Sequence, residues 1–443
     1  MKLLGILLTS ALAALAAAND TFLIRDADVY PVTAKEMKGV CVLIRDGKIA
    51  EIAPKIVPPK GMKVVEGKGL RVYPGMIDSD TNLGLQEIES VRESVDTGEL
   101  GEFMPQLRAL VAVNPASEHF GVVRVNGITS AMTFPNGGGG GGRGGGRGQS
   151  IAGQAALIHT DGMTWEEMEI SRSAAVQLTF PSVGGGGRRG GGGGGLPDEI
   201  AAEFGGAAGG ANARRNVDEA IAKINDFFDD ARRYKAAKAA NPPGFVTDLK
   251  FEAMIPVLDG KVPLAVSAGQ AEAIHDAIAF ADKQHVRIVI MGPREIGKVG
   301  PELKSHNIPV ILGRVLALPE HPDDAYEAAM MLPEEFYKAG VKFAFGTFTN
   351  EFVRNLPFQA AAAVAFGLPQ DEALKAVTIN PAEIWGVSDK VGSVEKGKWA
   401  DLLITNGDPL EIQTKIEHVY IKGMEVDLSN KQTRLYDKYI SRQ

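Results

Sequence analysis

Short apolar runs recur eight times through the middle of this 443-residue chain, and most are separated by stretches of helical character. The runs are YPGMID, ITSAMTFP, QAALIHT, AAVQLTF, VPLAVSA, RIVIMG, IPVILG and VKFAFGT. Apolar strands that alternate with helices form a parallel sheet covered by helices. Eight such strands are the number that closes a (β/α) barrel. We therefore predict an α/β fold with a TIM-like (β/α)8 barrel over residues 74–390.

The two ends of the chain have a different texture from the middle. Residues 19–73 read as short strands with turns, and the same pattern returns over residues 391–430. Asp46-Gly47, between two alternating runs, suits the positive φ angles of a tight hairpin turn. A second hairpin-like run, IEHVYIKGMEV, lies near the C-terminus. We predict one small β-sandwich domain built from both chain ends, followed by a C-terminal tail over residues 431–443.

The composition indicates a globular protein and excludes several kinds of site and partner. The chain has 44% hydrophobic and 23% charged residues, enough to build a large globular core. Its formal net charge of -8 argues against a nucleic-acid partner. Cys41 is the only cysteine, so neither an internal disulfide nor a cysteine metal cluster can form. Within a predicted strand, Cys41 is expected to be a buried small hydrophobe.

The first residues have the form of a signal peptide. Lys2 precedes an apolar run from Leu3 to Leu15, and the small residues Ala16-Ala17-Ala18 follow it. This order of charge, apolar run and small residues is typical of a cleaved leader over residues 1–18. No other stretch is long and apolar enough for a membrane span. We expect an exported protein of a bacterial periplasm or the extracellular space.

Two glycine-rich tracts, residues 137–148 and 184–195, each follow a predicted barrel strand. Glycine loses the most entropy on ordering and has no side chain to bury, so neither tract belongs to the core. We interpret both as exposed loops that tolerate expansion, because long surface insertions cost little. The alternative is a pair of lids whose arginines cover an anionic ligand at the barrel mouth.

The segment PGMIDSDTN over residues 74–82 and the segment GSVEKGKWADLL near the C-terminus occur in a characteristic order and separation. Together they resemble the amidohydrolase superfamily, in particular its imidazolonepropionase-like secreted branch. The resemblance implies hydrolysis of non-peptide carbon–nitrogen bonds by one or two divalent metals at the barrel mouth, where the metal activates water and polarises a carbonyl.

The resemblance also implies where the metal ligands would lie. The superfamily motif reads PGxIDxHxH, and its two histidines fall here on Asp80 and Asn82. The fifth-strand histidine falls on Ser267, the sixth on Met291 or Gly292, and the eighth-strand aspartate on Phe348. The mid-barrel lysine or acid has no assignable counterpart. Phe348 can neither ligate a metal nor accept a proton, so we infer a degenerate metal site and assign no metal.

Other residues offer partial replacements. The oxygen-bearing side chains near the first strand suit a hard divalent cation better than zinc, and they are Asp78, Asp80, Asn82, Glu87 and Glu89. His159 ends a predicted strand, so it either faces the barrel mouth or is a hydrogen-bonded structural residue. Ser267 lacks the Gly-x-Ser-x-Gly elbow of a nucleophilic serine.

The sequence thus favours an exported, catalytically degenerate barrel that retains binding of a small molecule or peptide. The candidate binding residues at the barrel mouth are Asp78, Asp80, Asn82, His159, Ser267 and Phe348. One alternative is an active hydrolase with a divalent metal rebuilt at Asp80. The other is a structural or assembly protein. Fold alone does not decide between these functions.

If the glycine tracts are tolerated insertions, they are also removable. Replacing residues 137–148 or 184–195 by a short Gly-Ser linker should leave the thermal midpoint within about 2 °C of the wild type, because neither tract brings apolar area to the core. Calorimetry of the two variants measures this. Loss of the cooperative transition in either one would assign that tract a structural role.

Overall fold

The computed structural model describes residues 20–135, 149–183, 198–318 and 324–442. The predicted leader and both glycine tracts lie outside these described residues. Among the described helices, none combines the length and the apolar character needed to cross a membrane.

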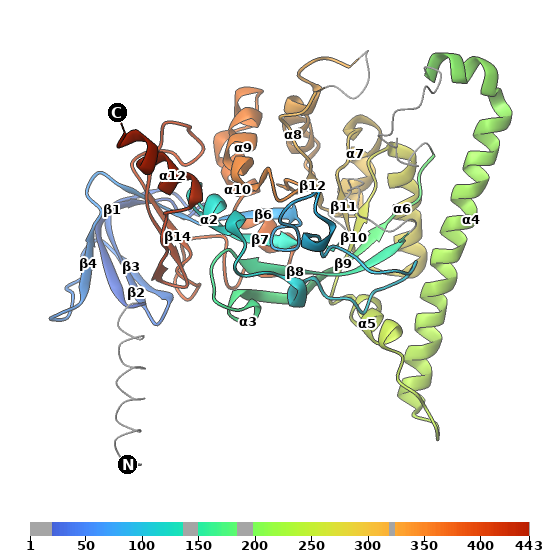
Figure 1. The fold of residues 1–443 in the computed structure, drawn as a ribbon, viewed down its shortest axis with the longest axis horizontal. Coiled ribbons are helices and arrows are strands. Elements are labelled where there is room, and N and C mark those ends of the chain that lie inside the picture. Colours follow the sequence, from blue (N-terminus) through green and yellow to red (C-terminus); the bar gives the residue numbers. More distant parts are fainter. Residues whose placement is uncertain (1–19, 136–148, 184–197, 319–323, 443) are drawn as a thin grey trace.

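The middle of the chain forms an eight-stranded, nearly closed barrel, and a separate mixed sheet adjoins it (Figure 1). This confirms the predicted fold class. The eight expected runs correspond in order to the strands β6 (Met76–Thr81), β7 (Ile128–Thr133), β8 (Ile151–His159), β9 (Glu169–Thr179), β10 (Leu264–Ser267), β11 (Ile288–Met291), β12 (Val310–Leu312) and β13 (Phe343–Phe345).

The prediction of a parallel barrel is wrong for one strand. β8 is antiparallel to both of its neighbours, β7 and β9, whereas the other paired strands of the barrel are parallel. A parallel pair needs a crossover of a dozen or more residues, usually a helix. Residues 160–168 between β8 and β9 are too few for that crossover, so the chain turns back directly. The end of β8 therefore lies at the opposite end of the barrel from the ends of the other strands.

Helices cover the outside of the barrel, and its interior is filled. Inward-facing Ile77, Met132, Ala175, Val289 and Ala344 belong to one buried cluster inside the barrel. The alternate strand residues pack outward against the helices in a larger cluster. The covering helices are α5 (Leu249–Leu258), α6 (Ala271–Gln284), α7 (Ile296–Ser305), α8 (Ala328–Ala339), α9 (Leu356–Ala365) and α10 (Gln370–Ala376). The short helix α11 (Ile379–Ile384) instead contributes side chains to the interior cluster.

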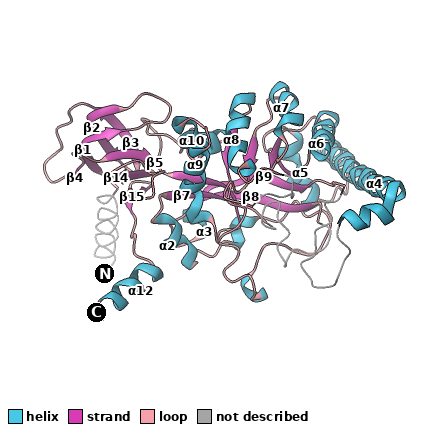
Figure 2. Ribbon diagram, turned by 90° about the horizontal axis from the view of Figure 1, so that it is seen from above, coloured by secondary structure: helices cyan, strands magenta, loops and turns pink. Residues whose placement is uncertain are grey.

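The remaining helices lie at the ends and edges of the molecule. The long helix α4 (Asp198–Ala240) runs along one edge against α5 and α6 (Figure 1). Shorter elements are α2 (Glu118–Arg124), α3 (Trp165–Met168) and the 3-10 turns Arg92–Ser94, Ala109–Ala112 and Val353–Asn355. The predicted C-terminal tail contains a helix, α12 (Lys431–Ile440), which contacts α2 and which Figure 2 shows projecting from the rest of the molecule.

Strands from both ends of the chain share the small sheet. They are β1 (Phe22–Val29), β2 (Met37–Arg45), β3 (Lys48–Ala53), β4 (Lys63–Glu66), β5 (Arg71–Pro74), β14 (Leu402–Thr405), β15 (Ile416–Ile421) and β16 (Met424–Glu425). The order is β16-β15-β14-β5-β1-β2-β3, with β4 paired to β1. Asp46 and Gly47 have φ of 51° and 71°, as the predicted hairpin requires. Phe22 stacks on Tyr420 with ring centroids 4.5 Å apart, which ties the two ends together.

Gly75 carries the chain from the small sheet into the barrel. Its N–H donates to the carbonyl of Asp401 at 2.9 Å, so this bond joins the N-terminal and C-terminal parts of the chain. A Cβ at this position would lie 2.1 Å from Thr129 Oγ1, so no other residue fits without displacing β7. The glycine of the PGMID segment is therefore a packing requirement of this junction.

The barrel closes where β6 meets the end of β13. The carbonyl of Asp80 accepts hydrogen bonds from the N–H groups of Thr347 at 3.0 Å and Phe348 at 2.7 Å. Asp78 is completely buried, and its carboxyl group accepts from the N–H groups of Thr347 and Asp80, each at 3.1 Å, and from the Thr347 hydroxyl. A Cβ on Gly346 would lie 2.9 Å from the Asp80 Cβ, so this glycine allows the two strands to approach.

Burial raises the pKa of Asp78 from 3.8 to about 7, against the opposing effect of hydrogen bonds from Thr347 and Asp80. The folded protein therefore keeps a proton that the unfolded chain has released, and its free energy of unfolding falls as pH rises from about 4 to about 7. The expected fall is on the order of 4 kcal/mol, because one pKa unit is worth about 1.4 kcal/mol.

Urea unfolding of wild type and Asp78→Asn across this pH range tests the assignment. The Asn variant cannot titrate, so it should lose this part of the pH dependence. Asp389→Asn, at an exposed carboxylate, is the matched control and should keep the wild-type dependence. Equal slopes for wild type and Asp78→Asn would contradict the assignment.

Candidate functional site

Four of the predicted site residues lie at the barrel mouth, where the parallel strands end. Asp80 belongs to β6 and Asn82 directly follows it, while Ser267 ends β10. Phe348 follows β13 and receives its position from the hydrogen bond to Asp80. Asp80 is completely buried and Asn82 is buried, whereas Ser267 and Phe348 are half-buried. The structure thus brings residues from opposite ends of the barrel sequence to one face, as the fold predicts.

Phe348 has an unusual backbone conformation at this face. Its φ is 61°, in the left-handed region that bulky residues rarely adopt. Such strain persists only where the surroundings enforce it, and it is concentrated at functional sites. A Cβ built on Gly292 or Gly313 would lie 3.8 and 3.7 Å from atoms of the Phe348 ring. The ring therefore packs over the glycines that follow β11 and β12.

Several buried oxygen atoms at the mouth have no hydrogen-bond partner among the described residues. They are Asn82 Oδ1, Gln177 Oε1, Ser267 Oγ and Asn350 Oδ1. The Asn350 Nδ2 donates to the carbonyl of Gln86 at 2.7 Å, which orients its oxygen as the free acceptor. Burying an acceptor without a partner costs free energy, so a ligand that donates hydrogen bonds would gain from meeting these atoms.

The sequence prediction missed Gln177 and Asn350. Gln177 lies on β9 two residues from inward-facing Ala175, and its neighbours Val176 and Leu178 pack outward. This alternation places Gln177 in the interior near the mouth. The sequence signal for Gln177 is that it is the one polar residue at an inward-facing position of the run AAVQLTF. No comparable pattern marks Asn350, because it follows β13 on an irregular loop.

The carboxylates expected as replacement ligands near the first strand lie in different surroundings. Among the described residues, no three His, Cys, Asp or Glu side chains come together in a group that could hold an ion. The carboxyl group of Asp78 is engaged by Thr347 at the barrel closure. Glu87 accepts from Asn114 Nδ2 at 3.3 Å, and Glu89 is exposed. Zinc requires four ligands, normally including nitrogen or sulfur from His or Cys.

His159 does not lie at the barrel mouth. It ends the antiparallel strand β8 and pairs with Ser130 near the start of β7, at the opposite end of the barrel. The residue is completely buried, and its Nε2 donates to Asp401 Oδ2 at 2.9 Å. Asp401 Oδ1 also accepts from the N–H of Lys422 at 2.7 Å. His159 is thus a hydrogen-bonded structural residue that connects the barrel to the small sheet.

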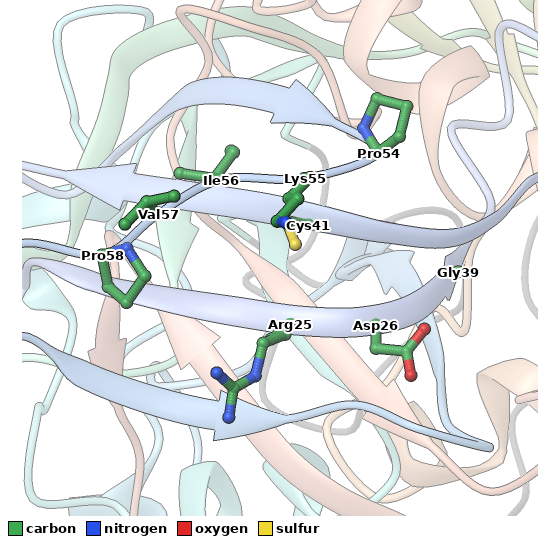
Figure 3. Close-up of a pocket in the computed structure, with 9 residues that line it drawn as sticks. All are labelled: Arg25, Asp26, Gly39, Cys41, Pro54, Lys55, Ile56, Val57 and Pro58. Atoms are coloured by element: carbon green, nitrogen blue, oxygen red, sulfur yellow. The ribbon is translucent and has the colours of Figure 1, made fainter.

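Two shallow, open cavities among the described residues lie away from the mouth. One of about 450 Å³ opens on the small sheet between β1, β2 and the segment after β3, with Cys41 in its wall (Figure 3). Cys41 is 5% exposed, in agreement with its predicted burial. Arg25 at the rim pairs with Glu66, so its charge is already engaged. The second cavity, of about 250 Å³, lies between α2 and α12.

An alanine variant is usually more stable than the glycine variant at the same position. The strained backbone of Phe348 predicts the reverse order of stability there. Phe348→Gly and Phe348→Ala both lose the ring, but only glycine adopts a φ of 61° without cost. The glycine variant should therefore be the more stable by about 1 kcal/mol. Denaturant unfolding measures the difference. At Phe345 on β13 the glycine variant should be less stable than the alanine variant. If the alanine variant were the more stable at Phe348 as well, the backbone at Phe348 would not be strained.

Comparisons with known proteins agree with this architecture. The model of the amidohydrolase family matches residues 304–426. A crystal structure of an amidohydrolase from Thermotoga maritima MSB8 is 26% identical, with a TM-score of 0.75 over 92% of this chain and 99% of that one.

Two curated relatives match over smaller shares of their own length. Amidohydrolase tasK from Hapsidospora irregularis is 23% identical over 410 residues, 86% of this chain and 39% of that protein. Imidazolonepropionase from Sphingopyxis alaskensis is 27% identical over 215 residues, 40% of this chain and 52% of that protein. The chain thus spans about two fifths and one half of the lengths of these relatives. The barrel, the sheet built from both chain ends and the family match over β12 to β16 all agree: the chain belongs to the amidohydrolase superfamily.

Proposed function

We propose that this protein is a catalytically degenerate amidohydrolase-superfamily barrel whose mouth binds a small molecule or peptide. The observation that carries the proposal is Phe348, whose ring packs over Gly292 and Gly313 at the position of the expected eighth-strand aspartate. A phenyl ring offers no metal ligand and no base. Asp80 and Asn82 supply oxygen where the family motif has histidine nitrogen.

The missing groups account for the expected loss of hydrolysis. In the family, a bound divalent metal supplies an activated water and polarises the scissile carbonyl. Neither contribution has an evident substitute among the described side chains at the mouth. Ser267 is half-buried, but His159, which a serine nucleophile would need nearby as a base, lies at the other end of the barrel.

The chemistry of the mouth favours a ligand rich in hydrogen-bond donors. The oxygens of Asn82, Gln177 and Asn350 are acceptors without partners among the described residues. Phe348 adds an apolar surface beside them. Primary amides, amines and amino-terminal peptide groups combine donors with an apolar body, and they match this surface better than carboxylates do.

An active hydrolase with a divalent metal at Asp80 is the second candidate. It is favoured by the relatives, which are named an amidohydrolase and an imidazolonepropionase. Export to a bacterial periplasm or the extracellular space, inferred from residues 1–18, belongs to the proposal under either candidate.

Elemental analysis after zinc or manganese exposure distinguishes the two candidates. The wild type should retain no stoichiometric metal. A restored variant with Asp80→His, Asn82→His, Ser267→His and Phe348→Asp supplies four ligands and should retain about one zinc per chain. Stoichiometric metal in the wild type that is lost in Asp80→Ala, together with turnover of a cyclic amide, would establish the hydrolase instead.

The ligand class is tested in the same preparations by thermal shift. Small primary amides and amines should raise the melting temperature, whereas carboxylates of matched size should not. Gln177→Leu removes one acceptor and should weaken the response by about tenfold in ligand concentration, as expected for roughly 1.4 kcal/mol. Tyr420→Phe removes a buried hydroxyl in the small sheet that also has no partner among the described residues, and should leave the response unchanged.

A further inference from the structure

The C-terminal helix α12 is attached to the molecule through polar contacts. Asn430 caps it by accepting from the N–H groups of Gln432 and Thr433, which makes its start a defined helix terminus. Arg434 approaches Glu118 of α2 at 4.0 Å, between exposed side chains. A polar cavity of about 250 Å³ lies between α12 and α2. The helix is therefore held at its first turn, and no residue of it is buried.

The apolar side chains of α12 remain largely exposed next to the described part of the chain. Leu435, Tyr436, Tyr439 and Ile440 are 40, 65, 53 and 49% exposed. The three later residues follow Leu435 by one, four and five positions, and this spacing places all four on one arc of the helix. A helix of ten residues gains little stability in water from its own hydrogen bonds. An unpartnered apolar arc on a capped helix therefore indicates an interaction surface.

Basic residues border this apolar arc. Lys431, Arg434, Lys438 and Arg442 lie on or directly after α12, against the single acid Asp437. Lys438 Nζ lies 5.8 Å and the Arg442 guanidinium 4.7 Å from the centre of the Tyr439 ring, so cations flank the arc directly. The chain as a whole carries a net charge of -8, which makes the local excess of cations at this end distinctive.

We propose that α12 lies in the surface of an anionic lipid bilayer, with Leu435, Tyr436, Tyr439 and Ile440 facing the lipid. Cations beside an apolar arc are the pattern of helices that bind in the plane of a membrane. Tyrosine suits the boundary between headgroups and acyl chains, because its ring is apolar and its hydroxyl is polar. A symmetric pairing of two copies through this arc would bring like charges together, which disfavours a second copy as the occupant. The proposal is independent of the function at the barrel mouth.

Vesicle sedimentation tests the proposal with protein purified after expression of the full chain. Wild type should bind vesicles in which roughly a third of the lipid is phosphatidylglycerol, and added salt should release it. Pure phosphatidylcholine should bind it much less. Lys431→Glu with Lys438→Glu should reduce the partition coefficient by about tenfold or more, since each cation contributes a several-fold effect. Tyr436→Ser with Ile440→Ser should also reduce it, through loss of apolar contact.

A matched control distinguishes the effect of the α12 substitutions from the effect of a change in net charge. Lys250→Glu with Lys283→Glu changes the net charge equally, at exposed sites on α5 and α6 at the far end of the molecule (Figure 1). This control should bind as the wild type does. Absence of wild-type binding to the anionic vesicles, or equal losses in the control and the α12 variants, would overturn the proposal. A dimer in solution that Tyr436→Ser with Ile440→Ser dissociates, without vesicle binding, would assign the arc to a second copy and also overturn it.

Discussion

The hydrogen-bonded junction between β6 and β13 is the constraint on which the rest of the structure depends. There the carbonyl of Asp80 accepts from two successive N–H groups after β13, and the buried Asp78 carboxyl group accepts from Thr347. These bonds join the first and last barrel strands, which are otherwise edges with unpaired backbone groups. The same bonds orient the chain at Phe348. Closure of the barrel and the shape of its mouth are therefore decided by one set of contacts.

This coupling separates the scaffold from the chemistry of the site. Asp78, Gly75 and Gly346 serve packing and closure, and each is explained by its immediate contacts. The Phe348 ring packs against the interior cluster and over two glycines, and the chain holds this residue in a strained backbone conformation. The PGMID motif is therefore accounted for by its role in folding the barrel, whatever chemistry the mouth performs. This is why family membership by itself leaves the activity open.

The reversed strand β8 shows how connection length controls what reaches the mouth. A short connection between β8 and β9 excludes parallel pairing, so His159 is carried to the end of the barrel that faces the small sheet. There its hydrogen bond to Asp401 links the middle of the chain to the strand region after residue 400. The carbonyl of Asp401 also accepts from Gly75, which leads the chain into the barrel, and its carboxylate accepts from Lys422, which directly follows β15. Two segments far apart in the sequence thereby become one connected structure.

The sequence by itself determined the elements: eight apolar runs became the eight barrel strands, and Asp46-Gly47 became a hairpin turn because positive φ angles are a local property of those residues. The resemblance also predicted which side chains stand at the expected ligand positions, since Asp80, Asn82, Ser267 and Phe348 could be aligned by motif and strand order. Only the tertiary structure decided the direction of β8, and with it the removal of His159 from the mouth. Only the tertiary structure added Gln177 and Asn350 there, and left the apolar arc of α12 uncovered. Strand direction, partner choice and exposure depend on contacts between distant residues, and local patterns carry no record of those contacts.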